Sequence, residues 1–153
     1  MKNWFKIILS IVFVFVVDLI TKHFLFDVEY FNLIPNVISV ATNGGNDGAA
    51  WGIFSGEILM LICVSVIMIA VLFVFNHFVK NKRTFSCLGF GFVIGGALGN
   101  LYDRIALSYV RDFIFLDFWP TFPVFNLADS FLCIGSVMLA IHILFAPGEK
   151  SEK

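Results

Sequence analysis

The sequence predicts an all-α membrane protein of four transmembrane helices with both termini in the cytoplasm. Of its 153 residues, 59% are hydrophobic and only 14% are charged, whereas soluble domains carry about a quarter charged residues. The mean hydropathy is +0.94, and four apolar runs are each long enough to cross a bilayer. The net charge of −1 provides no basic surface for nucleic acid.

The first predicted helix covers residues 4–26. At about 1.5 Å per residue, this run spans the hydrocarbon core. Its start resembles a secretory signal peptide, but the apolar segment is too long and no small-residue cleavage motif follows it. We therefore expect this helix to be retained.

The first extracytoplasmic loop, residues 27–57, contains no Lys or Arg. Within it, residues 33–41 are apolar and rich in β-branched side chains, which predicts a strand. The turn-forming residues 43–48 follow directly and end that strand. A small extracytoplasmic β element is therefore expected.

The other three helices are predicted at residues 58–78, 85–107 and 125–145, with a second outer loop at 108–124 and one integral-membrane domain over 1–153. Positive charges gather at three places that the positive-inside rule assigns to the cytoplasm. They are Lys2 and Lys6, the group Lys80, Lys82 and Arg83, and the tail residues Lys150 and Lys153. Arg104 and Arg111 oppose this trend.

This topology places the polar residues of the spans near the outer leaflet. They are Asp18 and Lys22 on the first helix, Asn100, Asp103 and Arg104 on the third, and Asp129 on the fourth. A carboxylate at the edge of a hydrocarbon-length segment predicts a functional site whose partner lies nearby.

Asp18 and Lys22 are spaced i, i+4 and share a helix face. One interpretation is that the pair makes a polar helical turn tolerable in lipid, with Lys22 snorkelling to the interface. The other is that Lys22 contacts a lipid head group or a substrate carbonyl. Arg104 either pairs locally with Asp103 or faces the site.

Gly91, Gly95 and Gly99 recur every four residues on the third helix. Small residues at this spacing allow a neighbouring helix to approach closely. Such packing would also fix Asn100 and Arg104, one turn apart, toward the site.

Asp112 is a candidate partner for Asp129, because a loop from the third helix to the fourth can return it to the same surface. Two carboxylates held close cannot both ionise easily, so one keeps a proton while the other acts as a base. This arrangement can activate water and protonate a leaving amine. Asp117 is a rival partner.

Two other functional classes stay open at this point. A Ser–Lys protease would pair Ser108 or Ser130 with Lys22. A small proton-coupled carrier or channel subunit would use Asp18, Lys22 and Asp129 as a relay.

No metal site is expected. Cys63, Cys87 and Cys133 lie in apolar runs without metal-binding spacing, and the three histidines form no zinc motif.

Five motifs, in order along nearly the whole chain, resemble those of lipoprotein signal peptidases, the signal peptidase II family of bacterial membrane aspartyl proteases. They are Asp18-Leu19-Ile20-Thr21-Lys22, Asn46-Asp47-Gly48-Ala49-Ala50-Trp51, the run from Gly95 to Arg104, Val110-Arg111-Asp112-Phe113, and Phe125-Asn126-Leu127-Ala128-Asp129-Ser130.

The resemblance implies that Asp112 and Asp129 are catalytic. It implies that other motif residues shape the substrate pocket or support it, namely Asn46, Gly48, Asn100, Arg104 and Asn126, with Asp18 and Lys22 in support. Neither a metal nor a cofactor is implied.

The implied substrate is a prolipoprotein, cleaved before its diacylglyceryl-modified cysteine by an enzyme in the bacterial cytoplasmic membrane whose active site faces outward. Membrane lipid is the other implied partner, nucleic acid is not one, and a monomer is expected. The resemblance also implies a lid-like outer loop over a small β-sheet.

The chain departs from the family pattern at Trp51, where Phe is usual. Asn43-Gly44 offers a second Asn-Gly before the Asn46 motif; we align Asn46 because Ala49-Ala50 and an aromatic residue follow it.

Overall fold

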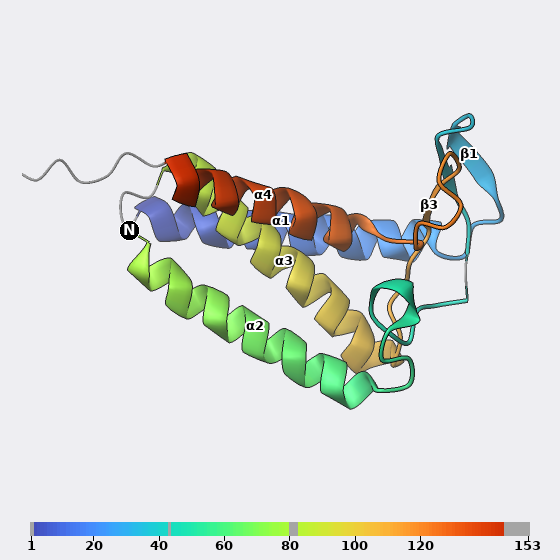
Figure 1. Cartoon of the computed structure of the whole chain (residues 1–153), viewed down its shortest axis with the longest axis horizontal. Helices are drawn as coiled ribbons and strands as arrows, with labels where there is room; N and C mark the ends of the chain where they lie inside the picture. Colours follow the sequence, from blue (N-terminus) through green and yellow to red (C-terminus); the bar gives the residue numbers. More distant parts are fainter. Residues whose placement is uncertain (1, 43, 80–82, 146–153) are drawn as a thin grey trace, which may run out of the picture.

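Four long helices form a bundle in the computed structural model, which describes residues 2–42, 44–79 and 83–145 (Figure 1). They are α1 Lys2–Leu25, α2 Ile58–Phe78, α3 Thr84–Leu107 and α4 Leu127–Phe145. All four are long and apolar enough to cross a membrane, which confirms the predicted class. α4 begins two residues later than predicted because Asn126 caps it.

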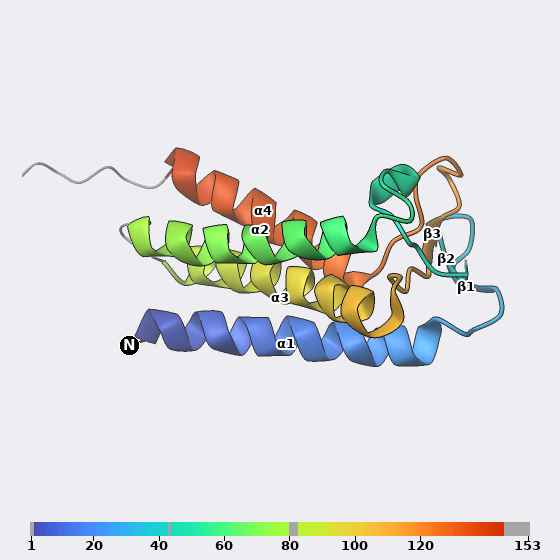
Figure 2. The same ribbon diagram turned by 90° about the horizontal axis from the view of Figure 1, so that it is seen from below.

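α3 is the centre of the bundle and packs against α1, α2 and α4 (Figure 2). In its most apolar window 67% of the residues are buried, against 22%, 6% and 22% in the corresponding windows of α1, α2 and α4. Because α3 is central, the polar residues at its outer end are enclosed by protein. The lipid-facing surfaces of the other helices stay apolar.

The glycines of α3 bring α1 into close contact. A Cβ atom added at Gly91, Gly95 or Gly99 would overlap side-chain atoms of α1, the last one at Asp18. The close-packing interpretation of this repeat is therefore confirmed, with α1 as the neighbour. Its consequence is that the polar face of α1 is pressed against α3.

A small antiparallel sheet lies beyond the helices, in the order β1-β2-β3. Its strands are β1 Phe31–Ile34, β2 Ile38–Val40 and β3 Ile114–Leu116. The expected single strand over residues 33–41 is wrong, because the segment folds back as a hairpin. Pro35 cannot continue the ladder, and Asn36 takes φ +61° in the turn.

The two outer loops are joined through the sheet. β3 comes from the second loop and pairs with β2 of the first. Farther along, Asn46 and Val110 exchange backbone hydrogen bonds of 2.9 and 2.8 Å. This pairing brings Asn46 beside the segment that carries Asp112.

The start of α1 and the end of α4 lie at the same end of the bundle, opposite the sheet (Figure 1). This arrangement agrees with a chain that crosses the membrane an even number of times. The residues Lys80, Lys82, Lys150, Lys153 and Asn43 lie outside the described part of the chain.

Candidate active site

Asp112 and Asp129 line one cavity of about 610 Å³ at the sheet end of the bundle. Its other polar side chains include those of Asn46, Asn100 and Arg104. Most of the remaining lining is apolar, from the 49–51 and 122–125 segments and from α4: Ala49, Ala50, Trp51, Phe122, Pro123, Val124, Phe125, Leu132, Cys133 and Ile134. A polar head with apolar walls suits a ligand that has both characters.

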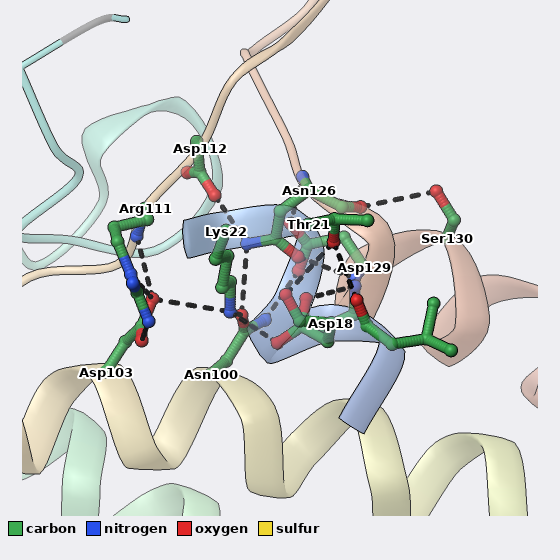
Figure 3. Close-up of polar contacts among 12 residues, drawn as sticks. Asp18, Thr21, Lys22, Asn100, Asp103, Arg111, Asp112, Asn126, Asp129 and Ser130 are labelled. Atoms are coloured by element: carbon green, nitrogen blue, oxygen red, sulfur yellow. Dashed lines mark hydrogen bonds and ion pairs between the residues drawn. The ribbon is translucent and has the colours of Figure 1, made fainter. Parts of the chain in front are cut away.

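Asn126 joins the two carboxyl groups (Figure 3). Its Nδ2 donates to Asp112 Oδ1 at 2.6 Å, and its backbone N–H donates to Asp129 Oδ2 at 3.1 Å. In return, the backbone N–H of Asp129 donates to Asn126 Oδ1 at 3.0 Å. This reciprocal pattern is a capping box, in which Asp129 occupies the third position of α4. Helix capping therefore fixes the Asp129 rotamer and places its carboxylate near the positive end of the helix dipole.

Asp112 is only 2% exposed. Its Oδ2 accepts a 2.9 Å hydrogen bond from Asn46 Nδ2, opposite the Asn126 bond to Oδ1. Burial raises the pKa of Asp112 to about 7, and the nearby negative charge of Asp129 acts in the same direction. Hydrogen bonds from Asn46 and Asn126 lower the pKa but do not cancel these effects.

Asp129 is held through Asn100 on α3. Asn100 Nδ2 donates to Asp129 Oδ1 at 2.7 Å. The carbonyl oxygen of the same amide accepts from Lys22 Nζ at 2.9 Å and from Asn126 Nδ2 at 3.1 Å. The ammonium of Lys22 therefore polarises an amide that binds the Asp129 carboxylate.

Lys22 is fully buried, with 0% exposure. Its Nζ lies 2.8 Å from Asp18 Oδ2 and 3.4 Å from Asp103 Oδ2. Snorkelling and contact with a lipid head group are therefore wrong for Lys22, because α1 turns this face into the bundle. Asp18 Oδ1 also accepts the Ala128 N–H at 3.0 Å, so it caps α4 from a different helix.

Arg104 does not form the local pair with Asp103 that was one of the two interpretations. Its Nη2 donates to the Gly48 carbonyl at 3.2 Å, and its buried Nε has no hydrogen-bond partner in the described chain. Gly48 N–H donates to Asn46 Oδ1 at 3.0 Å. Arg104 therefore lies against the loop that carries Asn46 and also lines the cavity.

The pairing of Asp103 with Arg111 was not predicted, although the sequence analysis named both residues. Arg111 Nη2 lies 2.7 Å from Asp103 Oδ1, and Arg111 Nε donates to Oδ2 at 3.2 Å. The sequence signal for Arg111 was that it opposes the positive-inside trend, as Arg104 also does.

The rival residues lie elsewhere or are already engaged. Asp117 accepts a 2.6 Å hydrogen bond from Ser39 in the sheet region and is absent from the described cavity lining. Ser130 lines the cavity, but its hydroxyl donates to the Asn126 carbonyl at 3.3 Å. Since the Lys22 ammonium is bound to Asp18 and Asn100, the geometry gives no support to a Ser–Lys pair.

Trp51 lies in a short 3-10 turn at φ +56° and is 67% exposed. Its ring contacts Phe122 with centroids 6.2 Å apart. Trp51 and Phe122 both line the cavity, so this aromatic pair forms part of its apolar wall.

Within the described ranges, no group of three or more His, Cys, Asp or Glu side chains is arranged to hold a metal ion. Acid–base chemistry by the two carboxyl groups is the chemistry that the site itself offers.

A family model described as signal peptidase (SPase) II matches residues 10–145. A lipoprotein signal peptidase of Clostridium acetobutylicum is 36% identical over 143 residues, covering 90% of this chain and 92% of the relative. One from Staphylococcus aureus is 36% identical over 153 residues, with 95% and 92% covered. A solved bacterial membrane enzyme superposes with a TM-score of 0.80 at 34% identity, covering 96% of this chain and 92% of that one.

Proposed function

The chain belongs to the signal peptidase II family, and on that basis we propose that Asp112 and Asp129 are the catalytic pair of this enzyme. It is an aspartic-type peptidase of a bacterial membrane that removes signal peptides from prolipoproteins. The observation that carries the proposal is that Asn126 binds both carboxyl groups at the head of one cavity. The family assignment favours a peptidase over the carrier or channel alternative.

Asp129 acts as the base and Asp112 as the acid in this proposal. Asp129 accepts hydrogen bonds from the Asn100 side-chain amide at 2.7 Å and from the Asn126 N–H at 3.1 Å, and these donors orient its carboxyl group in the cavity. Asp112 is buried and receives hydrogen bonds from neutral amides, and its pKa of about 7 lets it hold a proton at neutral pH. The pair thus begins the reaction with one proton, on Asp112.

Asp129 takes a proton from a water molecule as the water oxygen bonds to the scissile carbonyl carbon. Asp112 gives its proton to the carbonyl oxygen. When the C–N bond breaks, Asp129 gives its proton to the leaving amine and Asp112 takes a hydroxyl proton from the gem-diol, so the pair again holds one proton, on Asp112. The Arg104 guanidinium lies in the same cavity wall and is placed to stabilise negative charge on the carbonyl oxygen.

The apolar cavity walls support a lipidated substrate, cleaved before a diacylglyceryl-modified cysteine. The walls along α4, at Leu132 and Ile134, give acyl chains and the signal helix a surface continuous with the membrane. Trp51 and Phe122 cover the other side of the reacting bond.

We place this site on the extracytoplasmic side. Lys2 and Lys6 are at the opposite end of the bundle, and the loop 27–57 next to the cavity contains no Lys or Arg. The enzyme is proposed to act as a monomer, since Asn46, Asn100 and Asn126 already supply hydrogen bonds to both carboxyl groups without a second copy.

The test is cleavage of a diacylglyceryl-modified precursor by purified Asp112→Asn and Asp129→Asn variants. Both should accumulate in the membrane but leave the precursor uncut, because each loses one half of the proton exchange. Asp117→Asn is the matched control and should cleave normally, since its carboxyl group bonds in the sheet region. Normal cleavage by either of the first two variants would remove the basis for the pair.

A further inference from the structure

Arg111 is the residue next to Asp112, yet its side chain points toward Asp103 on α3 (Figure 3). It is absent from the described cavity lining, and 16% of its side chain is exposed. Arg111 therefore does not contact a substrate in the cavity, and any role in the reaction must pass through other residues.

Three donors of Arg111 reach the buried carboxylate of Asp103. Nη2 donates to Oδ1 at 2.7 Å, while Nε and the backbone N–H donate to Oδ2 at 3.2 and 3.0 Å. Bidentate guanidinium–carboxylate pairs fix geometry as well as charge. Since Asp103 lies on the rigid central helix, this contact attaches the loop backbone to α3.

The attachment lies one residue before Asp112. On one side, Val110 is held by its two backbone bonds to Asn46. On the other, Phe113 N–H donates to the Phe125 carbonyl at 3.1 Å. Of these three contacts on either side of Asp112, the Arg111–Asp103 contact joins the segment to a helix of the bundle, whereas the other two join it to loops.

The same contact balances charge around Lys22. Asp18 and Asp103 carry two negative charges opposite the two positive charges of Lys22 and Arg111. Without Arg111, the buried Asp103 carboxylate would face Lys22 alone and attract its ammonium, now 3.4 Å away. Lys22 would then be drawn from the 2.9 Å bond to Asn100, which holds Asp129.

We propose that Arg111 is a positioning residue for both aspartates: through Asp103 it fixes the backbone that carries Asp112 and keeps Lys22 on Asn100. The inference rests on the proposed catalytic pair. It assigns to Arg111 a function in turnover and none in substrate binding.

The test compares Arg111→Ala, Arg111→Lys and wild type on a lipidated precursor peptide at constant, neutral pH. Arg111→Ala should lower kcat about 100-fold, the effect expected of a misplacement of about 1 Å, and leave KM within about twofold. Arg111→Lys keeps the charge without the planar fork, so its kcat should be about tenfold below wild type. Guanidinium ion added to folded Arg111→Ala should restore part of kcat, because it replaces the missing cation beside Asp103. A variant with a purely structural defect would not regain kcat in this way, since the concentration of folded enzyme is held constant.

Asp117→Asn is the control, because it alters an outer-loop carboxyl group that has no contact with Lys22 or Asp112. A wild-type kcat in Arg111→Ala, or a loss confined to KM, overturns the inference. If Arg111→Ala does not accumulate, a wild-type kcat in folded Arg111→Gln overturns it. Asp112→Asn and Asp129→Asn are assayed in parallel. If they cleave normally, the assignment of the catalytic pair is wrong and this inference is wrong with it. If they are inactive while Arg111→Ala keeps the wild-type kcat, only this inference is refuted.

Discussion

Replacing Asn46 with Ala should move the alkaline limb of the pH–activity profile to higher pH. Asp112 must hold a proton to act as the acid, so kcat/KM of the wild-type enzyme should fall as pH rises through the Asp112 pKa of about 7. The Asn46 Nδ2 hydrogen bond favours the ionised carboxylate and lowers that pKa. Its removal must therefore raise the pKa, and Asp112 will keep its proton to higher pH.

The size of the shift follows from the contact that is lost. A hydrogen bond to a charged group contributes about 1.5–3 kcal/mol, and one pKa unit corresponds to about 1.4 kcal/mol. Because Asn46 is only half-buried, water will replace part of the bond. We expect a shift of about one unit, to near pH 8. The backbone bonds of Asn46 to Val110, at 2.9 and 2.8 Å, do not depend on its side chain, so the loop should stay in place.

The measurement is kcat/KM for a lipidated fluorogenic peptide in detergent micelles, from acidic to alkaline pH. This ratio reports the free enzyme, which is the state that the structure describes. Asp117→Asn is the control and should keep the wild-type limb. An Asn46→Ala limb that is unchanged, or that moves to lower pH, would refute the assignment of Asp112 as the acid.

Three further perturbations test the surrounding structure. Lys22→Met leaves buried carboxylates without their shared cation and should destabilise the protein by about 3–5 kcal/mol; its melting temperature should partly recover in Asp18→Asn/Lys22→Met, where Asn can still accept the cap bond from Ala128. Gly99→Ala adds a Cβ that overlaps Asp18, so it should lower both melting temperature and activity far more than Gly89→Ala, whose nearest contact would be 3.2 Å. Trp51→Ala should raise KM for a lipidated precursor with little change in kcat, while Trp51→Phe should retain the wild-type KM.

The helices, and the position of Asp112 and Asp129 in one cavity, could be predicted from the sequence. Apolar runs of bilayer length fix the four spans locally, without knowledge of their neighbours. The pairing of Asp129 with Asp112 followed from the motifs, and the loop between them carries Pro120 and Pro123, which prevent one continuous helix. The sequence could not predict β3, because a strand of three residues acquires its partner only when two loops distant in sequence meet.

The burial of Lys22 was also beyond the sequence. Its i, i+4 spacing from Asp18 places both on one face of α1 but does not say which way that face points. The apolar residues of α1 surround the helix almost evenly, so no hydrophobic stripe specifies its rotation. The rotation is set by Gly99 on α3, which leaves room for the Asp18 carboxylate.

The amide of Asn100 explains how a buried cation can lie so near a pair that must keep one proton. A direct contact between Lys22 and Asp112 would favour ionisation of Asp112 and remove the acid. Asn100 accepts from Lys22 at 2.9 Å and donates to Asp129 at 2.7 Å, so the cation supports one carboxylate through a neutral group. An ionised aspartate at position 100 would accept from Lys22 but could not donate to Asp129. It would also add a third negative charge around Lys22, beside those of Asp18 and Asp103. An amide suits this position, because it accepts from Lys22 and donates to Asp129 at the same time.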